Sequence, residues 1–192
     1  SYSKASSIQQ NASDWNIGHS IYVNSIEKSN IHAIDLIEKG VESFHFTLPT
    51  DEISLENLLN NIDTSKIPIY FEPLFISEKL VQTLNTYAVN HNASFYILND
   101  PIGHLARSGN WHKNLTSDLD HLKQILATGP DLKSVLSVDL GLFQNAGGSM
   151  IQQLAYTLAH ANEYLNLVDE KSLKSIVFKV SVGGNYFFEI AK

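Results

Sequence analysis

Strand-like and helix-like runs alternate along almost the whole chain, and this alternation restricts the fold more than any other feature. The strand-like runs are predicted at Ile17–Val23, Ser43–Leu48, Pro68–Leu74, Ser94–Leu98, Ser134–Leu140 and Ser175–Val182. The helical patterns between them are predicted at Ser29–Lys39, Ser54–Ile62, Ser77–His91, Thr116–Ala127 and Ser149–Val168. Each repeat takes roughly 25–40 residues, which is the spacing of βαβ units and predicts an α/β protein with a parallel sheet. No linker or shift in composition divides the chain, so we expect one domain over residues 1–192.

Composition excludes several classes of protein. The formal net charge is −7, and nucleic-acid binding needs clustered lysine and arginine, so a nucleic-acid partner is not expected. The chain has no cysteine, which removes disulfides and thiolate metal sites. No apolar run approaches the ~18 residues of a membrane span, and no secretory signal is visible. A cytoplasmic location with no membrane partner is therefore expected.

Polar residues recur at every second position in the strand-like runs. They are Ser43, His45 and Thr47 in one run, Tyr70 and Glu72 in the next, then Ser137 with Asp139, and Lys179 with Ser181. Strands buried on both faces usually read as continuous apolar runs. Polar residues at alternate positions therefore indicate either a barrel axis lined with polar side chains or an open sheet with one solvated face.

The most distinctive stretch is FQNAGGSMIQQLAYTLAHANEYLN, from Phe143 to Asn166. A polar turn leads into a helix that Ser149 would cap, with Gln152 completing a capping box. Apolar residues fall on one face of this helix at the spacing of a buried amphipathic helix, namely Ile151, Leu154, Ala155, Leu158 and Leu165.

The wording of this stretch closely resembles the barrel domain of the methylmalonyl-CoA mutase family, and other segments match in the same order. DWNIGHSIYVNSIEKSN resembles the first strand and the start of its helix, and LIEKGVESFHFTLPT the second strand with the helix before it. FYILND ends in the family's Asn-Asp pair, and HLARSGNW follows as its arginine-containing loop. SIVFKVSVGGNYFFEIAK resembles the sixth strand, a glycine turn and the next helix start.

The resemblance implies a TIM-type (β/α)8 barrel. A full barrel needs eight strands, whereas about six are visible here, so we expect a partial barrel of about six parallel strands. In this family an acyl-CoA substrate threads along the barrel axis between small polar side chains, which favours the polar-lined axis. The substrate-binding residues implied are His45, Thr47, Asn99, Arg107, Ser137, Asp139 and Gln144.

Arg107 has independent support as a binding residue, because it is the one arginine in a chain that otherwise uses lysine. The planar guanidinium grips carboxylates and phosphates in a way that lysine cannot. We expect it in a loop at the C-terminal rim of the barrel, flanked by His104 and His112. An exposed loop charge is the competing interpretation.

Family members that catalyse the radical rearrangement carry groups that are absent here. The Asp-x-His-x-x-Gly motif that ligates the cobalt of adenosylcobalamin does not occur in the chain. Leu98 stands where active members have a glutamine, and Leu142 where they have a histidine; a leucine neither donates a hydrogen bond nor transfers a proton. The active members' tyrosine ahead of Trp15 aligns loosely with Gln10.

These losses imply a small, non-catalytic subunit with no catalytic or metal-binding residue of its own. It would form a heterodimer with a catalytic large subunit that holds adenosylcobalamin, in a complex that interconverts methylmalonyl-CoA and succinyl-CoA. Two alternatives stay open: a competent acyl-CoA mutase whose cobalamin domain lies outside this chain, and a stand-alone acyl-CoA-binding barrel. Open sheet edges also predict self-association.

One further motif gives only a weak indication of a metal site. His160 and Glu163 form a single His-x-x-Glu on a helix, and one such pair is more often a surface or interface pair than a metal site.

Overall fold

The computed structural model describes residues 15–167 and 176–192. In this part of the chain the strands are β1 (Gly18–Tyr22), β2 (Ser43–Leu48), β3 (Ile69–Pro73), β4 (Phe95–Ile97), β5 (Ser137–Asp139) and β6 (Val177–Lys179). The helices are α1 (Ile26–Glu38), α2 (Leu55–Leu58), α3 (Glu78–His91), α4 (Pro101–Ser108), α5 (Leu115–Thr128), α6 (Gly141–Asn145), α7 (Met150–Leu167) and α8 (Tyr186–Ala191). Every predicted strand is present, although most are shorter than predicted.

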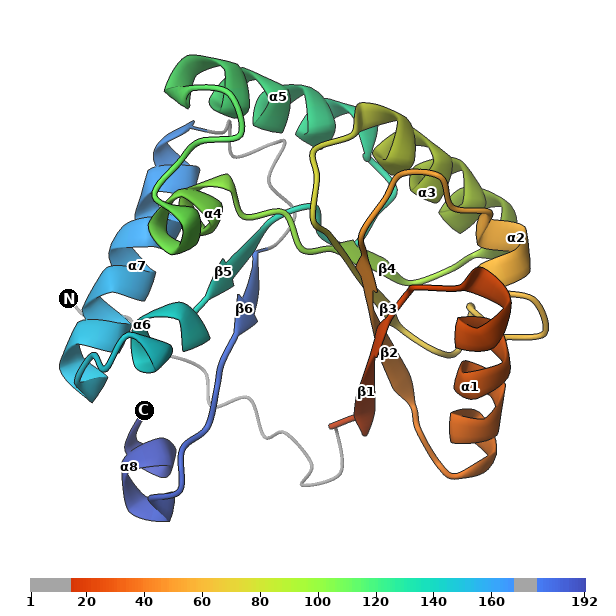
Figure 1. Cartoon of the computed structure of the whole chain (residues 1–192), viewed down its shortest axis with the longest axis horizontal. Helices are drawn as coiled ribbons and strands as arrows, with labels where there is room; N and C mark the ends of the chain where they lie inside the picture. The colour runs from red at the N-terminus through yellow and green to blue at the C-terminus, as the bar shows by residue number, and fades with distance from the viewer. Residues whose placement is uncertain (1–14, 168–175) are drawn as a thin grey trace, which may run out of the picture.

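The strands are parallel and follow one another in sequence order. Strands β1 to β4 form one sheet, and β5 pairs with β6 in a second. The two sheets meet through a parallel bridge between Tyr96 and Ser134, where the Ile97 N–H donates to the Ser134 carbonyl at 2.8 Å. Figure 1 shows the strands as the inner side of an arc, with α1, α3, α5 and α7 outside it. The α/β class and the parallel order are confirmed, whereas the partial TIM-type barrel stays a prediction.

Side chains at every second position of the strands, on one face of the sheet, form the core. Phe44, Phe46, Phe71 and Phe95 are fully buried in a cluster with apolar residues of α1, α3 and α5. Burying one such side chain stabilises the fold by roughly 1.5–3 kcal/mol. Because side chains alternate across a strand, those at the remaining positions face the inner side of the arc. There the register aligns Ser20, His45, Tyr70 and Tyr96 in one row across four strands.

Helix α7 corrects a prediction. Its capping box is confirmed, since the Gln152 side chain accepts from the Ser149 N–H at 2.9 Å and the Ser149 hydroxyl accepts from the Gln152 N–H. The apolar face predicted to be buried is largely exposed, however, with Ile151 at 75% and Leu158 at 64%. The buried residues of α7 are Gln153, Thr157, His160, Ala161 and Tyr164. Val168, the predicted last residue, lies outside the described residues.

Helix α4 corrects a second prediction, because Arg107 lies in this helix and not in a loop. Asp100 caps α4 by accepting from the Gly103 N–H at 2.8 Å, and Pro101 occupies the first turn. Both residues are typical helix-start signals. The sequence analysis does not predict this helix start, because the Asn-Asp pair that contains Asp100 also ends a strand-like run.

None of the described helices is both long and apolar enough to cross a lipid bilayer.

Candidate functional site

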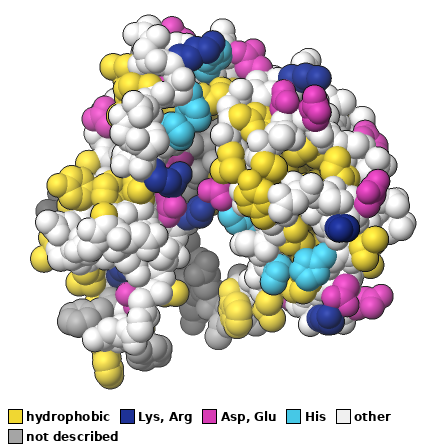
Figure 2. Space-filling model, viewed as in Figure 1, with side chains coloured by type: hydrophobic (Ala, Val, Ile, Leu, Met, Phe, Trp, Pro, Cys, Tyr) yellow, Lys and Arg dark blue, Asp and Glu magenta, His cyan; other side chains and the backbone are white. Residues whose placement is uncertain are grey.

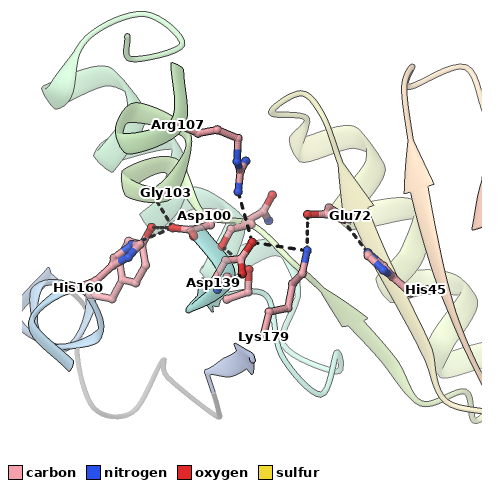
Figure 3. A network of polar contacts seen from close by, with 12 residues as sticks. His45, Glu72, Asp100, Gly103, Arg107, Asp139, His160 and Lys179 are labelled. Atoms are coloured by element: carbon pink, nitrogen blue, oxygen red, sulfur yellow. Dashed lines mark hydrogen bonds and ion pairs between the residues drawn. The ribbon is translucent and has the colours of Figure 1, made fainter. Parts of the chain in front are cut away.

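Charged side chains from four strands meet on the inner side of the arc. His45 Nε2 lies 2.8 Å from Glu72 Oε2, and Lys179 Nζ donates to Glu72 Oε1 at 2.9 Å. The His45 ring also faces β1, where its Nδ1 lies 3.2 Å from the Ser20 hydroxyl. Figure 3 shows His45, Glu72 and Lys179 turned toward one another, and Figure 2 shows charged and histidine side chains gathered at the centre of the face.

The same network continues through Asp139 to helix α4. Asp139 Oδ2 lies 3.8 Å from Lys179 Nζ and 3.5 Å from a guanidinium nitrogen of Arg107. The other oxygen of Asp139 accepts from the Gly141 N–H at 2.8 Å. Positive and negative groups therefore alternate from Arg107 to Glu72, so each carboxylate is paired.

The pKa of Glu72 reports this pairing. Burial alone would raise it, but the contacts with His45 and Lys179 outweigh burial and lower the pKa from 4.5 to about 2. Glu72 is therefore ionised at neutral pH and holds β2, β3 and β6 together electrostatically.

A cavity of about 280 Å³ opens at the carboxyl ends of β3, β4 and β5. Its apolar wall includes Leu74, Phe75, Ile76, Leu98, Leu122 and Ile125. Its polar wall includes Glu72, Asn99, Asp100, His104, Arg107, His112, Asp118, Ser137, Asp139 and Lys179. Ligands of parallel α/β proteins usually bind at this end of the strands.

Two histidines stack in the cavity wall. The rings of His104 and His112 are nearly parallel, at 13°, with centroids 3.7 Å apart. Burial, followed by the proximity of His104, lowers the pKa of His112, and Asp118 partly opposes the shift. The neutral form of His112 is therefore favoured at neutral pH.

A buried polar cluster lies behind this cavity. Asp100 Oδ1 accepts from the Tyr164 hydroxyl at 2.6 Å and lies 2.8 Å from His160 Nε2. The Ile102 N–H donates to the Tyr164 oxygen at 3.1 Å. Burial and the nearby Asp100 raise the pKa of Tyr164, so its hydroxyl stays a donor. The cluster joins α7 to the start of α4.

Sequence reasoning missed this cluster. His160 was interpreted as a surface or interface residue, yet its side chain is 4% exposed. The available signal was that His160 and Tyr164 stand four positions apart, and therefore lie on one face of a helix.

The predicted substrate-binding residues fall into three places. Asn99, Arg107, Ser137 and Asp139 line the cavity. His45 and Thr47 lie on β2, on the inner side of the arc. Gln144 lies on α6, where its side-chain oxygen accepts from Lys192 Nζ at 3.0 Å. Substrate binding by any of them stays a prediction.

Several of these groups are already satisfied within the chain. The Ser137 hydroxyl donates to the Asn99 carbonyl at 3.4 Å, and the Asn99 amide donates to the Val135 carbonyl at 3.3 Å. Arg107 is the more available group, since its side chain is 52% exposed and its ion-pair partner is 3.5 Å away.

The described residues contain no group of three or more His, Cys, Asp or Glu side chains that could hold a metal ion. The imidazoles at the site also have other contacts: His45 with Ser20 and Glu72, His160 with Asp100, and His104 with His112. Gln10, the position aligned with the family's tyrosine, lies outside the described residues.

Parallel strands in sequence order, with helices on their outer side, define an α/β protein whose cavity lies at the carboxyl ends of the strands. The family profile described as methylmalonyl-CoA mutase matches residues 50–192. The chain therefore belongs to the methylmalonyl-CoA mutase family.

Two curated relatives support the same assignment. The chain is 26% identical to the methylmalonyl-CoA mutase small subunit of Porphyromonas gingivalis, over 93% of its own length and 31% of the relative's. It is 25% identical to the methylmalonyl-CoA mutase small subunit of Streptomyces virginiae, over 86% of its own length and 29% of the relative's. The chain thus spans under a third of either relative.

Proposed function

We propose that this chain is part of a non-catalytic small subunit of methylmalonyl-CoA mutase. Its role is to support a catalytic large subunit by heterodimerisation. The complex interconverts methylmalonyl-CoA and succinyl-CoA, with adenosylcobalamin held by the partner and not by this chain.

The observation that carries this proposal is Leu98. Active members of the family have a glutamine before the Asn-Asp pair, whereas here a leucine that is 6% exposed lines the cavity at that position. Leucine offers no hydrogen bond to a substrate carbonyl. Leu142 follows on α6, where active members have a histidine. Both losses favour a subunit that keeps the fold without the chemistry.

The charge network supports the same proposal. His45, Glu72, Lys179 and Asp139 pair with one another, and such pairing leaves few polar groups for a substrate. A network that links β2, β3, β5 and β6 serves the rigidity of the sheet. This is what a supporting subunit requires.

The test is to express this protein with and without the catalytic subunit from the same organism. We expect the two to co-elute in size-exclusion chromatography, and only mixtures containing the large subunit to form succinyl-CoA from methylmalonyl-CoA. Succinyl-CoA formation by this protein alone, with added adenosylcobalamin, would contradict the proposal. Failure to co-elute would contradict the heterodimer.

A second candidate is acyl-CoA binding without mutase chemistry, and the cavity with its available arginine favours it. In this candidate the acyl end of the ligand would contact Asn99, Arg107, Ser137 and Asp139, which line the cavity. The other predicted binding residues, His45, Thr47 and Gln144, lie outside the cavity lining. Calorimetric titration with succinyl-CoA tests this candidate. We expect weak binding that Arg107→Ala removes; binding that is unchanged in Arg107→Ala would reject the assignment of Arg107.

A further inference from the structure

The stacked rings of His104 and His112 take part neither in the charge network nor in the proposed function. His104 lies in α4, and His112 lies in the connection between α4 and α5. Both rings line the cavity, and their centroids are 3.7 Å apart. The stack therefore joins two segments of the cavity wall that no helix or strand holds together.

The backbone on one side of the stack is fixed. The carboxylate of Asp118, which is 1% exposed, accepts from the His112 N–H at 2.8 Å and from the Lys113 N–H at 3.1 Å. Movement at this point therefore falls on the His112 side chain and not on the main chain beside it.

A parallel stack of two imidazoles disfavours a positive charge on both rings at once. Two unit charges at this spacing repel each other even though solvent at the exposed His112 screens part of the repulsion, and the repulsion disappears when either ring is neutral. The lowered pKa of His112 agrees with this geometry, since burial and the neighbouring His104 both disfavour its charged form.

The remaining charges around the cavity do not replace this effect. Asp118 on α5 attracts a proton to His112, while its oxygens are already engaged by two backbone N–H groups. Arg107 on α4 adds a positive charge to the cavity wall. The other charged groups of the wall are Glu72, Asp100, Asp139 and Lys179, on β3, at the start of α4, on β5 and on β6. Glu72, Asp139 and Lys179 pair with one another, and Asp100 pairs with His160 and Tyr164.

We propose that the His104–His112 stack is a proton-sensitive latch in the cavity wall. With both rings neutral they stay stacked; when both are protonated the rings separate and the His112 side chain, which is exposed at the rim, swings away and widens the mouth of the cavity. This inference does not depend on the proposed function, because it concerns the cavity of this chain alone.

Trp111 precedes His112 and can report the change. In a Trp15→Phe background Trp111 is the one remaining tryptophan. We expect quenching of its fluorescence by acrylamide to rise about twofold between pH 7.5 and pH 4.5, a window that extends below the ordinary titration of histidine because the pKa of His112 is lowered. Nuclear Overhauser contacts between the two imidazole rings should vanish over the same range. Far-UV circular dichroism should stay constant, which separates latch opening from unfolding.

Two variants make the test decisive. In His104→Phe an aromatic ring remains but cannot be charged, so the pH dependence of quenching should be lost. The pKa of His112 in that variant should rise, because the contribution of His104 is removed while that of burial remains. His32→Phe, the same change on the exposed side of α1, should behave as the parent. Ring contacts that persist at pH 4.5, quenching that does not change with pH, or an unaltered response in His104→Phe would each overturn the latch.

Discussion

At the scale of the residue, Glu72 makes stability depend on pH in a predictable direction. Its folded pKa of about 2 lies below the ordinary 4.5, so its contribution is fully present above pH 4.5 and is lost as pH falls toward 2. The shift corresponds to about 3 kcal/mol, of which about 1 kcal/mol is lost by pH 3.5. Urea denaturation at pH 6 and pH 3.5 should therefore show a larger loss for the parent than for Glu72→Gln. Glu163→Gln, on the exposed side of α7, is the control, and equal losses in both variants would refute the argument.

Gly103 gives a second prediction at this scale. A Cβ at this position would overlap the carboxylate of Asp100, which caps α4 and also contacts His160 and Tyr164. Gly103→Ala should displace that carboxylate and lower the free energy of unfolding by at least about 1–2 kcal/mol. Gly184→Ala has open space around the new Cβ and should be close to neutral. Thermal unfolding of both variants checks the prediction, which fails if they behave alike.

At the scale of the element, α7 shows where periodicity misleads. The capping box and the length of the helix follow from local sequence, and both were predictable. The buried face does not, because it depends on what the neighbouring elements offer: Asp100 receives Tyr164, and the Gly148 carbonyl accepts from Gln153 at 2.8 Å. Polar side chains were therefore buried with partners, while Leu158 was left exposed.

Because α7 buries polar side chains and exposes apolar ones, substitutions of its buried polar residues should destabilise the fold more than substitutions of its exposed apolar residues. Tyr164→Phe removes the donor to Asp100 and leaves the Ile102 N–H without its acceptor, so we expect a loss of about 1–3 kcal/mol. Leu158→Ser changes a side chain that is 64% exposed and should alter stability by less than about 0.5 kcal/mol. Chemical denaturation of the two variants measures both. A larger loss for Leu158→Ser would restore the face predicted from periodicity.

At the scale of the whole molecule, the sheet was predictable and the site only in part. Strand order follows from βαβ spacing, and the polar pattern at alternate positions correctly marked His45, Glu72, Asp139 and Lys179 as inward candidates. The pairing of these residues was not predictable, because Glu72 and Lys179 meet across 107 positions of sequence. A contact of that range depends on the curvature of the sheet, which no local pattern encodes. Arg107 was predicted at the rim, but its helix was missed.

The exposed surface of α7 and β6 predicts how the 192-residue chain behaves without a partner. Leu154 and Leu158 of α7 share a surface groove with Phe178 and Val180 around β6, and β1 and β6 both end their sheets. Apolar surface next to strand edges that no other described strand covers favours association, at about 25 cal/mol per Å² of apolar area buried. We therefore expect self-association that increases with concentration in sedimentation velocity experiments. Leu158→Lys combined with Val180→Lys should shift the chain toward monomer, whereas Leu115→Lys combined with Val89→Lys, which adds the same charge at exposed residues of α5 and α3, should not. Added large subunit should compete with self-association if this surface also serves the heterodimer. A parent chain that stays monomeric at high concentration would show that the apolar surface and the strand edges are too small or too separated to drive association.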